Sequence, residues 1–292
     1  MQNRRNFLKQ LSIVLAGGAL APQILSSCAG GGSSKHIGLQ VYSLRDMVKE
    51  HGIQKVLEAV AKMGYKHLET AGYNNGKIYG MAPGEYKKLC DDLGLRTTSA
   101  HLGRNLSSNR DEDMSWWNKA VETHNEAGLK YMVMPFSPLG KEDVTMDDVK
   151  KYCNYFNEIG LITAGASIQF GYHNHAFEFE RKLDGAPIYD AMMKLTSPDH
   201  VLFEMDVYWV QKGGYDPVEY INKYADRVKL LHIKDEKTIG KSGTMNFEGI
   251  FNAAYAKGVI KDWYVEVERY DTTPEADVKA SYDYLANATY VK

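Results

Sequence analysis

The sequence predicts an α/β protein, a single (β/α)8 TIM barrel that follows an N-terminal export signal. Three observations support this fold class: eight short apolar runs of strand character, amphipathic stretches between them, and glycines that end several of those stretches. Strands that alternate with helix-length crossovers form a parallel sheet. Eight such repeats in a chain of this length favour closure into a barrel. An open doubly wound sheet is the rival, but its usual glycine-rich phosphate loop does not occur.

The eight runs combine β-branched and aromatic residues with the short length that is typical of buried strands. The predicted strands cover residues 37–42, 66–71, 96–101, 130–134, 168–174, 201–206, 228–233 and 263–268.

The stretches between the runs have helical periodicity and should cover the outside of the barrel. They are residues 54–62, 83–92, 116–127, 146–159, 188–194, 217–224 and 247–256. A glycine that follows a helix readily adopts the left-handed conformation that ends it. The glycines expected to do so are Gly64, Gly94, Gly128, Gly160 and Gly258.

The first residues have the features of an export signal. Arg4 and Arg5 form the pair of a twin-arginine signal. The apolar stretch over residues 11–25 is too short to span a bilayer. It leads into Cys28 in a context that resembles a bacterial lipobox, in which the chain is cleaved before the cysteine and the thiol is acylated.

These features divide the chain into three parts. Residues 1–27 are the predicted twin-arginine and lipoprotein signal, residues 28–35 a Gly/Ser-rich flexible tether, and residues 36–292 the barrel. The expected product is an exported bacterial protein, periplasmic or on the cell surface, which is held at a membrane only by lipid on Cys28. The sequence leaves open which leaflet holds the lipid.

Composition limits the partners of the barrel. The formal net charge is −2, with 35 basic and 37 acidic residues, so nucleic-acid binding is disfavoured. Beyond Cys28 only Cys90 and Cys153 remain, and we expect isolated thiols rather than a disulfide framework. A small molecule is therefore the expected partner. A homo-oligomer is compatible with this fold, although no interface can be predicted.

Metal-binding or proton-transferring groups follow the last four predicted strands. In a β/α barrel the C-terminal ends of the strands meet at one mouth, where active sites lie. Carboxylates and imidazoles from four strands would there form an oxygen-rich site for a divalent metal. The groups are His173, His175 and Glu178, then Asp206, then His232 and Lys234, then Glu266 and Glu268.

Strand alternation ranks the candidates within each run. Glu204 and Asp206 share a face, and Asp206 is nearer the mouth, which favours it as a ligand. His232 and Lys234 also share a face, and they suit a metal ligand and a group that binds a substrate hydroxyl or oxyanion.

The other two runs leave alternatives open. Glu268 is the preferred ligand of the last strand because it lies nearest the predicted end, and Glu266 is the alternative. In the first run, Glu178 is the preferred ligand, with His173 and His175 as substrate-binding or proton-transfer groups. The His-x-His spacing would also suit metal binding.

Residues at earlier strand ends are candidates for substrate contacts. Together with the aromatic Trp209 that follows Asp206, they are Gln40, Tyr42, Glu69 and His101.

Four stretches in this order resemble those of the xylose-isomerase-like β/α barrels, the sugar phosphate isomerases and epimerases: GYHNHAFEF, FEMDVYWV, KLLHIKD and WYVEVE. The early stretch GLQVYSLRD fits as well, and the resemblance extends from residue 37 to the C-terminus. It implies one divalent metal ion (Mn, Co, Zn or Mg) held by Glu, Asp, His and Glu. On this chain those ligands would be Glu178, Asp206, His232 and Glu268. The chain departs from the family's pattern at the first Glu, where His173 and His175 occupy the strand end.

The resemblance implies a metal-dependent sugar isomerase or epimerase that removes a proton next to a keto group of its sugar substrate. In that reaction His173, His175, Lys234 and Glu266 would be the catalytic groups. Loss of a β-substituent from the same enediolate would instead make the protein a lyase or hydratase that acts on 3-keto-glycosides. The export signal favours a substrate without phosphate. A non-catalytic sugar-binding lipoprotein is the alternative outside enzymes.

Overall fold

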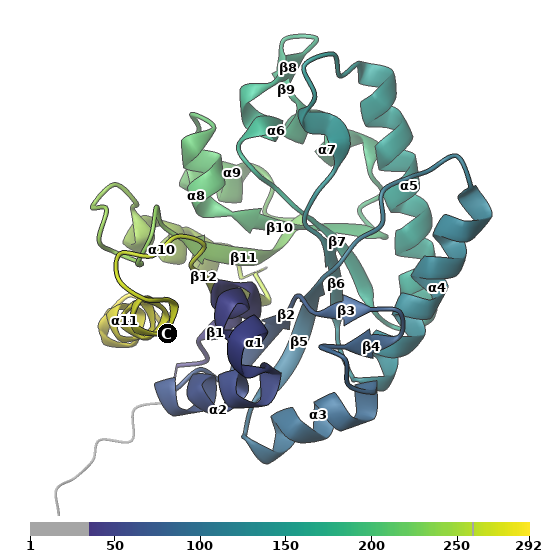
Figure 1. Cartoon of the computed structure of the whole chain (residues 1–292). Coiled ribbons are helices and arrows are strands. Elements are labelled where there is room, and N and C mark those ends of the chain that lie inside the picture. Colours follow the sequence, from purple (N-terminus) through teal and green to yellow (C-terminus); the bar gives the residue numbers. More distant parts are fainter. Residues whose placement is uncertain (1–34, 259) are drawn as a thin grey trace, which may run out of the picture. The chain divides into compact units, whose positions relative to one another are not determined.

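A computed structural model describes residues 35–258 and 260–292, and these residues form a closed, eight-stranded parallel barrel (Figure 1). The predicted export signal lies outside the described residues. Each predicted strand is present, and its ends fall within two residues of the expected ones. In order around the barrel the strands are β1 (Gly38–Gln40), β12 (Asp262–Glu266), β11 (Val228–Lys234), β10 (Val201–Asp206), β7 (Gln169–His173), β6 (Tyr131–Met134), β5 (Arg96–His101) and β2 (His67–Thr70).

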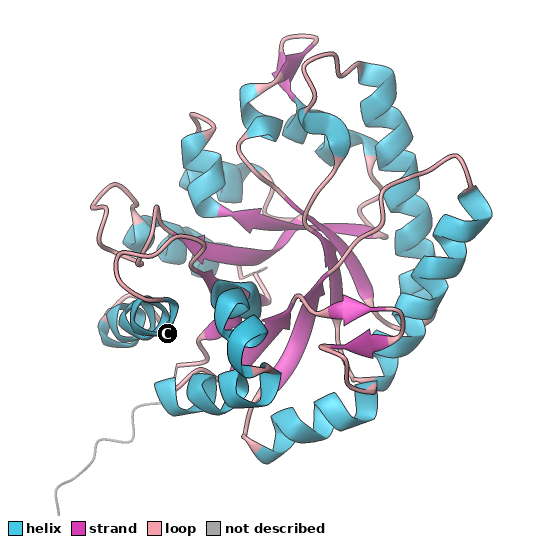
Figure 2. Cartoon of the chain, in the orientation of Figure 1, coloured by secondary structure: helices cyan, strands magenta, loops and turns pink. Residues whose placement is uncertain are grey.

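Helices surround the barrel (Figure 2). The main ones are α2 (Ile53–Met63), α3 (Pro83–Asp92), α4 (Arg110–Glu126), α5 (Met146–Gly165), α7 (Ile188–Leu195), α9 (Pro217–Lys223), α10 (Phe247–Lys257) and α11 (Pro274–Asn287). Shorter elements lie in the loops: α1 (Arg45–His51), α6 (Phe177–Glu180), α8 (Val207–Lys212), the hairpin of β3 (Tyr73–Asn74) and β4 (Lys77–Ile78), and the hairpin of β8 (Lys182–Leu183) and β9 (Ala186–Pro187). None of the helices among the described residues is long and apolar enough to cross a membrane.

All seven predicted helices are present, but two differ from the prediction in length. α4 starts six residues earlier than expected, where the side chain of Asn109 accepts a hydrogen bond from the amide of Glu112 and caps the helix. α5 continues through Gly160 to Gly165, so the prediction that Gly160 ends it was wrong. A Cβ on Gly160 would lie 2.2 Å from the carbonyl oxygen of His200, which shows that this glycine serves a close approach between backbones.

The other glycine predictions hold. Gly64 and Gly258 end α2 and α10 in the left-handed conformation, and Gly94 and Gly128 also have positive φ. α11 was not predicted, because its buried side chains include Asp277 as well as Val278 and Leu285 and so give little hydrophobic periodicity.

The apolar core lies mainly between the sheet and the helices, and the barrel interior carries a second, smaller cluster. The small cluster consists of Tyr131, Val133, Leu202 and Leu230. Gly171 leaves room for it, since a Cβ there would lie 2.6 Å from Leu202 Cδ1. Towards the C-terminal ends of the strands, the side chains inside the barrel are polar. The candidate functional site lies there.

Candidate metal centre and substrate cavity

The two-residue alternation of the strands stacks the inward-facing side chains in layers. On β10, Leu202 belongs to the apolar layer, Glu204 lies one layer higher, and Asp206 lies at the C-terminal end of the strand. On β11, His232 and Lys234 follow Leu230 in the same way. Each strand therefore contributes one group to a deeper polar layer and one to the mouth.

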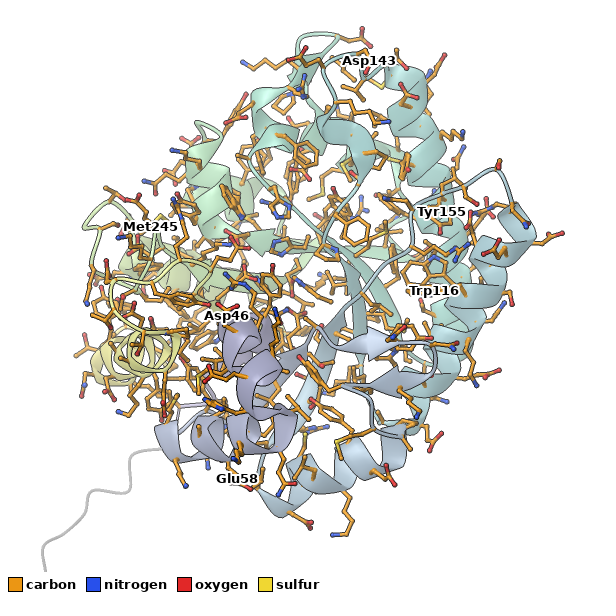
Figure 3. All side chains as sticks on the ribbon, viewed as in Figure 1. Asp46, Glu58, Trp116, Asp143, Tyr155 and Met245 are labelled. Carbon is orange, nitrogen blue, oxygen red and sulfur yellow. The ribbon has the colours of Figure 1, made fainter. Side chains whose placement is uncertain are left out.

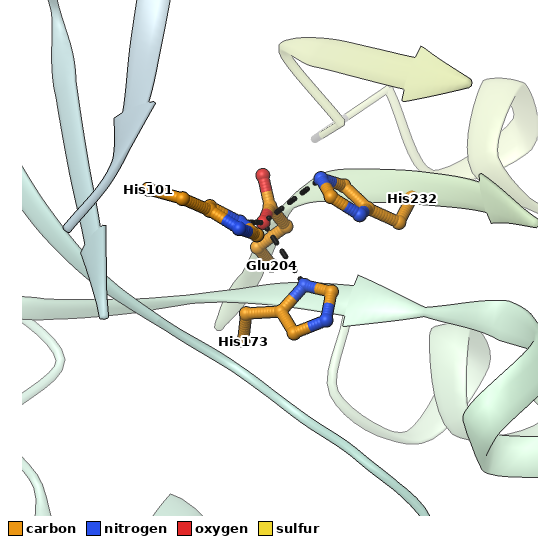
Figure 4. A group of neighbouring side chains, drawn as sticks. All are labelled: His101, His173, Glu204 and His232. Carbon is orange, nitrogen blue, oxygen red and sulfur yellow. Dashed lines mark hydrogen bonds and ion pairs between the residues drawn. The ribbon is translucent and has the colours of Figure 1, made fainter. Parts of the chain in front are cut away.

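Glu204 is the centre of the deeper layer (Figure 4). Its Oε2 lies 2.6 Å from His101 Nε2, 3.1 Å from His173 Nδ1 and 3.2 Å from His232 Nε2. These four side chains come from β5, β7, β10 and β11, and they are all buried. One carboxylate thus fixes the orientation of three imidazole rings.

Glu69 on β2 completes this layer. Its Oε1 accepts a hydrogen bond from Ser99 at 2.6 Å, and its Oε2 accepts one from Gln40 Nε2 at 2.7 Å. The same Oε2 is 2.6 Å from His232 Nε2 and 3.1 Å from His101 Nε2. The sequence placed Gln40 and Glu69 among the substrate contacts, but both are completely buried beneath the imidazoles and do not line the cavity described below.

The candidate metal centre lies between the two layers: His173 and His232 of the deeper layer meet Asp206 and Glu266 nearer the mouth, and the ligand atoms of these four groups all lie within 4.8 Å of one another. His173 Nε2 is 3.9 Å from Asp206 Oδ2, and His232 Nδ1 is 3.3 Å from Glu266 Oε2. The other nitrogen of each imidazole bonds to a carboxylate below. Metal-binding histidines usually have this arrangement, because the second nitrogen then fixes ring and tautomer.

An unsatisfied oxygen supports the fit of a metal ion. Asp206 Oδ1 accepts a hydrogen bond from the amide of Trp209, whereas Oδ2 is buried and has no hydrogen-bond partner among the described residues. The Lys234 ammonium lies 3.8 Å from this oxygen, beyond hydrogen-bond distance. A buried carboxylate oxygen without a hydrogen bond is costly, and a metal ion bound directly to it would reduce that cost. Two imidazoles and two carboxylates are a donor set that suits a divalent transition metal.

Burial and neighbouring charges shift the pKa values of these groups. Burial raises the pKa of Asp206 to about 7 although Lys234 opposes the change. Burial, with His232 and His101 nearby, lowers the pKa of His173 well below its usual value. For His232, burial is outweighed by three carboxylates, which raise its pKa. The charge of each of these buried groups therefore depends on the charged side chains that lie next to it.

Lys234 lies beside the candidate metal centre and contacts three acidic side chains. Its Nζ is 2.9 Å from Glu266 Oε2, 2.8 Å from Glu268 Oε2 and 3.8 Å from Asp206 Oδ2. It also lies 4.9 Å from the centre of the Trp209 ring. Burial would lower the pKa of Lys234, but the three acids raise it, so this amine is an ammonium donor.

Two of the expected ligands lie elsewhere. Glu178 Oε1 accepts a hydrogen bond from Tyr172 at 2.7 Å, its Oε2 accepts one from the amide of His175 at 2.8 Å, and burial raises its pKa to about 8. Glu268 lies beyond the end of β12 and contacts Lys234. Neither belongs to the two groups of close ligand atoms among the described residues, which are His173, Asp206, His232 and Glu266 and, deeper in the barrel, His101, His173, Glu204 and His232.

Sequence reasoning did not identify two supporting residues. Asn174 holds Asp206 by both backbone groups, since its Oδ1 accepts from the Asp206 amide at 3.1 Å and its Nδ2 donates to the Asp206 carbonyl at 3.3 Å. The role of Glu204 beneath three histidines was also not predicted, although its shared face with Asp206 was. For Asn174, only its position at the end of β7 could have indicated a contact with the neighbouring strand.

A cavity of ≈ 420 Å³ opens above the candidate metal centre. His101, His173, His175, Glu266 and Glu268 line its polar part. Burial, together with Lys234, lowers the pKa of His175 to about 4, so this imidazole is neutral near pH 7 and can accept a proton. Trp209 is not among the lining residues, and its ring lies 5.6 Å from that of His175. Tyr42 and His101, two of the predicted substrate contacts, line the cavity, and their contact with a substrate stays a prediction.

The model of the xylose isomerase-like TIM barrel family matches residues 57–288. The chain belongs to this family. It is 39% identical to a sugar phosphate isomerase/epimerase from Parabacteroides distasonis, with a TM-score of 0.81 over 88% of this chain and 100% of that one. A second solved sugar phosphate isomerase/epimerase from this organism is 38% identical, with a TM-score of 0.82 over 90% of this chain and 98% of that one.

Curated relatives are more distant and are named for a different reaction. An inosose dehydratase from Geobacillus kaustophilus is 24% identical over 62% of this chain, which spans 61% of that relative's length. An inosose dehydratase from Clostridium beijerinckii is 25% identical over 68% of each chain. These similar proteins are thus named as sugar phosphate isomerases/epimerases or as inosose dehydratases.

Proposed function

We propose that this protein is a divalent-metal-dependent sugar isomerase or epimerase that abstracts a proton next to the keto group of its substrate. The observation that carries the proposal is the group of His173, Asp206, His232 and Glu266, with a buried oxygen on Asp206 that has no hydrogen-bond partner among the described residues. Two of these residues, His173 and Glu266, also line the cavity. The similarity to sugar phosphate isomerases/epimerases supports the same reaction class.

These four residues would hold the metal, and a bound divalent ion would supply Lewis acidity to the keto group and its neighbouring hydroxyl. His175 would accept the proton, because it is neutral, half-buried and lines the cavity. Lys234 would donate a hydrogen bond to the oxygen on which negative charge develops. Protonation of the opposite face of the same carbon, by water or a second acid on that side, gives an epimer. Return of the proton from His175 to the neighbouring carbon gives an isomer.

The proposed metal is Mn, Co or Zn rather than Mg. Mg²⁺ prefers oxygen ligands and retains several waters, whereas two of the four donors here are imidazole nitrogens. Imidazole suits the transition metals.

A lyase or dehydratase is the second candidate, and the curated inosose dehydratases favour it. Elimination begins with the same proton abstraction and continues with loss of a β-substituent, such as the hydroxyl of a cyclic ketone or the glycosidic oxygen of a 3-keto-glycoside. The two candidates require the same base and metal. They differ only in the fate of the enediolate.

The test combines metal content with solvent-deuterium exchange on the chain from Ser33 onward. We expect about one metal ion per chain, lost in Asp206→Ala and His232→Ala, whose folding is checked by circular dichroism. The loaded protein should introduce deuterium next to the carbonyl of a keto-sugar. Loss of water or of an aglycone in the mass spectrum would identify the lyase. If no metal is bound after incubation with excess Mn²⁺, the proposed metal-dependent reaction would be contradicted. A non-catalytic sugar-binding lipoprotein would then be favoured.

We also propose that export and a lipid on Cys28 tether this barrel to a membrane, as the residues before it predict. The measurement is incorporation of a labelled fatty acid into the full chain in a bacterial host with twin-arginine export. Cys28→Ser should lose the label and remain in the soluble fraction. Label retained by this variant would contradict the anchor.

A further inference from the structure

The cavity above the metal centre has two chemically different ends. The inner end carries the imidazoles and carboxylates described above. The outer end carries aromatic rings, which are Tyr42, Tyr73, Trp116 and Phe136. Trp116 lies on α4 (Figure 3), and its ring is 5.2 Å from that of Tyr73 on the β3–β4 hairpin. The inner end therefore suits a hydroxyl-rich ring near a metal, and the outer end suits the apolar face of another ring.

No lysine or arginine among the described residues lines this cavity. Lys234 lies beside the metal centre, in contact with Glu266 and Glu268, and does not line the cavity. Arg45 does not line it either: its guanidinium packs on the Tyr42 ring, 4.6 Å from the ring centre, and donates to the carbonyl of Glu268 and the hydroxyl of Tyr270. Glu266 and Glu268 face the cavity instead. Binding a phosphate group without a cationic partner and beside carboxylates is unfavourable, because like charges repel and the oxygens of phosphate need strong donors.

The aromatic end is exposed to an unusual degree for this molecule. Tyr42 is 43% exposed and Phe136 is 42% exposed. Only three other large hydrophobic side chains among residues 35–258 and 260–292 are similarly exposed, and none of them lines this cavity. Gly103 accommodates the Phe136 ring, since a Cβ on it would lie 3.2 Å from Phe136 Cζ. Aromatic rings held open at the mouth of a polar site are suited to stack on a ligand.

We propose that the substrate is an unphosphorylated keto-sugar that carries a second sugar ring, and that Tyr42, Trp116 and Phe136 form the subsite for that ring. The inference rests on the proposed function, because it takes the metal centre as the place of the reacting ring. The inference concerns the group attached to the reacting sugar ring, which we propose is a glycosyl group and not a phosphate. The cavity volume is within the range of about 300–1,000 Å³ found for pockets that hold ligands of this size.

Matched ligands test this directly by calorimetric titration of the metal-loaded protein. Fructose, fructose 6-phosphate and palatinose share a reducing ketose, and the last two carry a phosphate or a glucosyl group on the same oxygen. We expect palatinose to bind at least about tenfold more tightly than fructose 6-phosphate. Equal or tighter binding of the phosphate, or no preference among the three ligands, would overturn the proposal.

Variants locate the subsite. Phe136→Ala and Tyr42→Ala should weaken the binding of palatinose by about two- to tenfold and leave that of fructose within about twofold, as expected for the loss of one ring contact. Both side chains are well exposed, so folding should persist. Leu161→Ala is the matched control, because Leu161 is 55% exposed on α5 and lies outside the cavity. Palatinose affinity unchanged in both aromatic variants would overturn the subsite.

These experiments distinguish a failure of the proposed subsite from a failure of the proposed reaction. Deuterium exchange into fructose without any preference for palatinose would retain the proposed reaction and refute the second-ring subsite. A palatinose preference that depends on Phe136, with no exchange into any keto-sugar, would retain the subsite and refute the proposed reaction.

Discussion

Glu266 and Glu268 lie two residues apart, and the end of a strand separates their roles. β12 ends at Glu266, which pairs with Lys234 of β11 and faces His232. Glu268 lies in the following loop, 29% exposed, with its carboxylate on Lys234. The sequence favoured Glu268 because the predicted strand continued two residues further, to residue 268.

The first prediction concerns these alternatives. Glu266→Gln should lose the metal, whereas Glu268→Gln and Glu178→Gln should retain about one ion per chain, because their carboxylates lie outside the group of close ligand atoms. Metal content by mass spectrometry of the purified variants is the measurement. Retention by Glu266→Gln together with loss in Glu268→Gln or Glu178→Gln would restore the ligand set that the sequence favoured.

The second prediction concerns Glu204, which is a positioning residue. Glu204→Gln should lower metal affinity by about 10- to 100-fold, the usual effect of losing a carboxylate behind a histidine ligand. Competition with a metal-binding dye measures this without any assay of activity. Glu180→Gln is the control, because Glu180 is exposed on α6. An affinity equal to that of the control would show that Glu204 does not orient the histidines.

At the scale of elements, the length of α5 depended on a contact that local sequence does not contain. A glycine that follows an amphipathic stretch usually ends a helix. Gly160 instead remains helical because the backbone at His200, forty residues away, packs against it. The start of α4 is the opposite case: Asn109 and the acids after it are a local cap, and the prediction missed them by relying on hydrophobic periodicity.

The third prediction follows from this contact. Gly160→Ala should lower the free energy of unfolding by about 1–3 kcal/mol, because its Cβ would overlap the His200 carbonyl. Gly165→Ala in the same helix meets no atom within 4 Å, so it should be neutral or stabilise by up to about 1 kcal/mol. Urea denaturation measures both. Equal effects of the two substitutions would contradict the close approach.

At the scale of the whole molecule, a buried histidine couples stability to pH. His124 on α4 is buried, its Nδ1 bonds to the carbonyl of Ala120 at 2.7 Å, and its Nε2 has no partner among the described residues. Burial lowers its pKa from 6.5 to about 4. As the pH falls below 6.5, the unfolded chain binds a proton that the folded chain does not accept until about pH 4. The associated stability is therefore complete above pH 6.5 and is lost between pH 6.5 and 4.

The fourth prediction is that His124→Gln reduces the loss of stability in acid. This group alone should cost the wild type about 2 kcal/mol between pH 7.5 and pH 5, at about 1.4 kcal/mol per unit of pH below 6.5. Urea denaturation at both pH values measures the difference. His51→Gln, at the exposed end of α1, should keep the pH dependence of the wild type. A similar pH dependence in His124→Gln would show that His124 is not the group responsible.

Local sequence by itself determined the barrel, the order of its strands and helices, and the stretches of sequence that supply polar groups to its mouth. Strand alternation and helical periodicity act over a few residues, and eight repeats of them leave few ways to bury the apolar faces. Asp206 and His232 could be singled out because each follows an apolar run near a strand end: Asp206 is the last residue of β10, and His232 lies two residues before the end of β11. Their strands are adjacent in the barrel, as consecutive β/α units usually are.

Only the tertiary structure decided which of the candidate site residues contact one another. Closing the barrel brings His101 and Glu69 of the early strands to within 3.1 Å of each other and directly beneath His232. It also brings Tyr42 and Phe136 to one cavity mouth. These proximities depend on strand register and tilt, which are set by packing around the whole barrel and by no single segment. The same register places His173 and Glu266, rather than Glu178 and Glu268, beside Asp206.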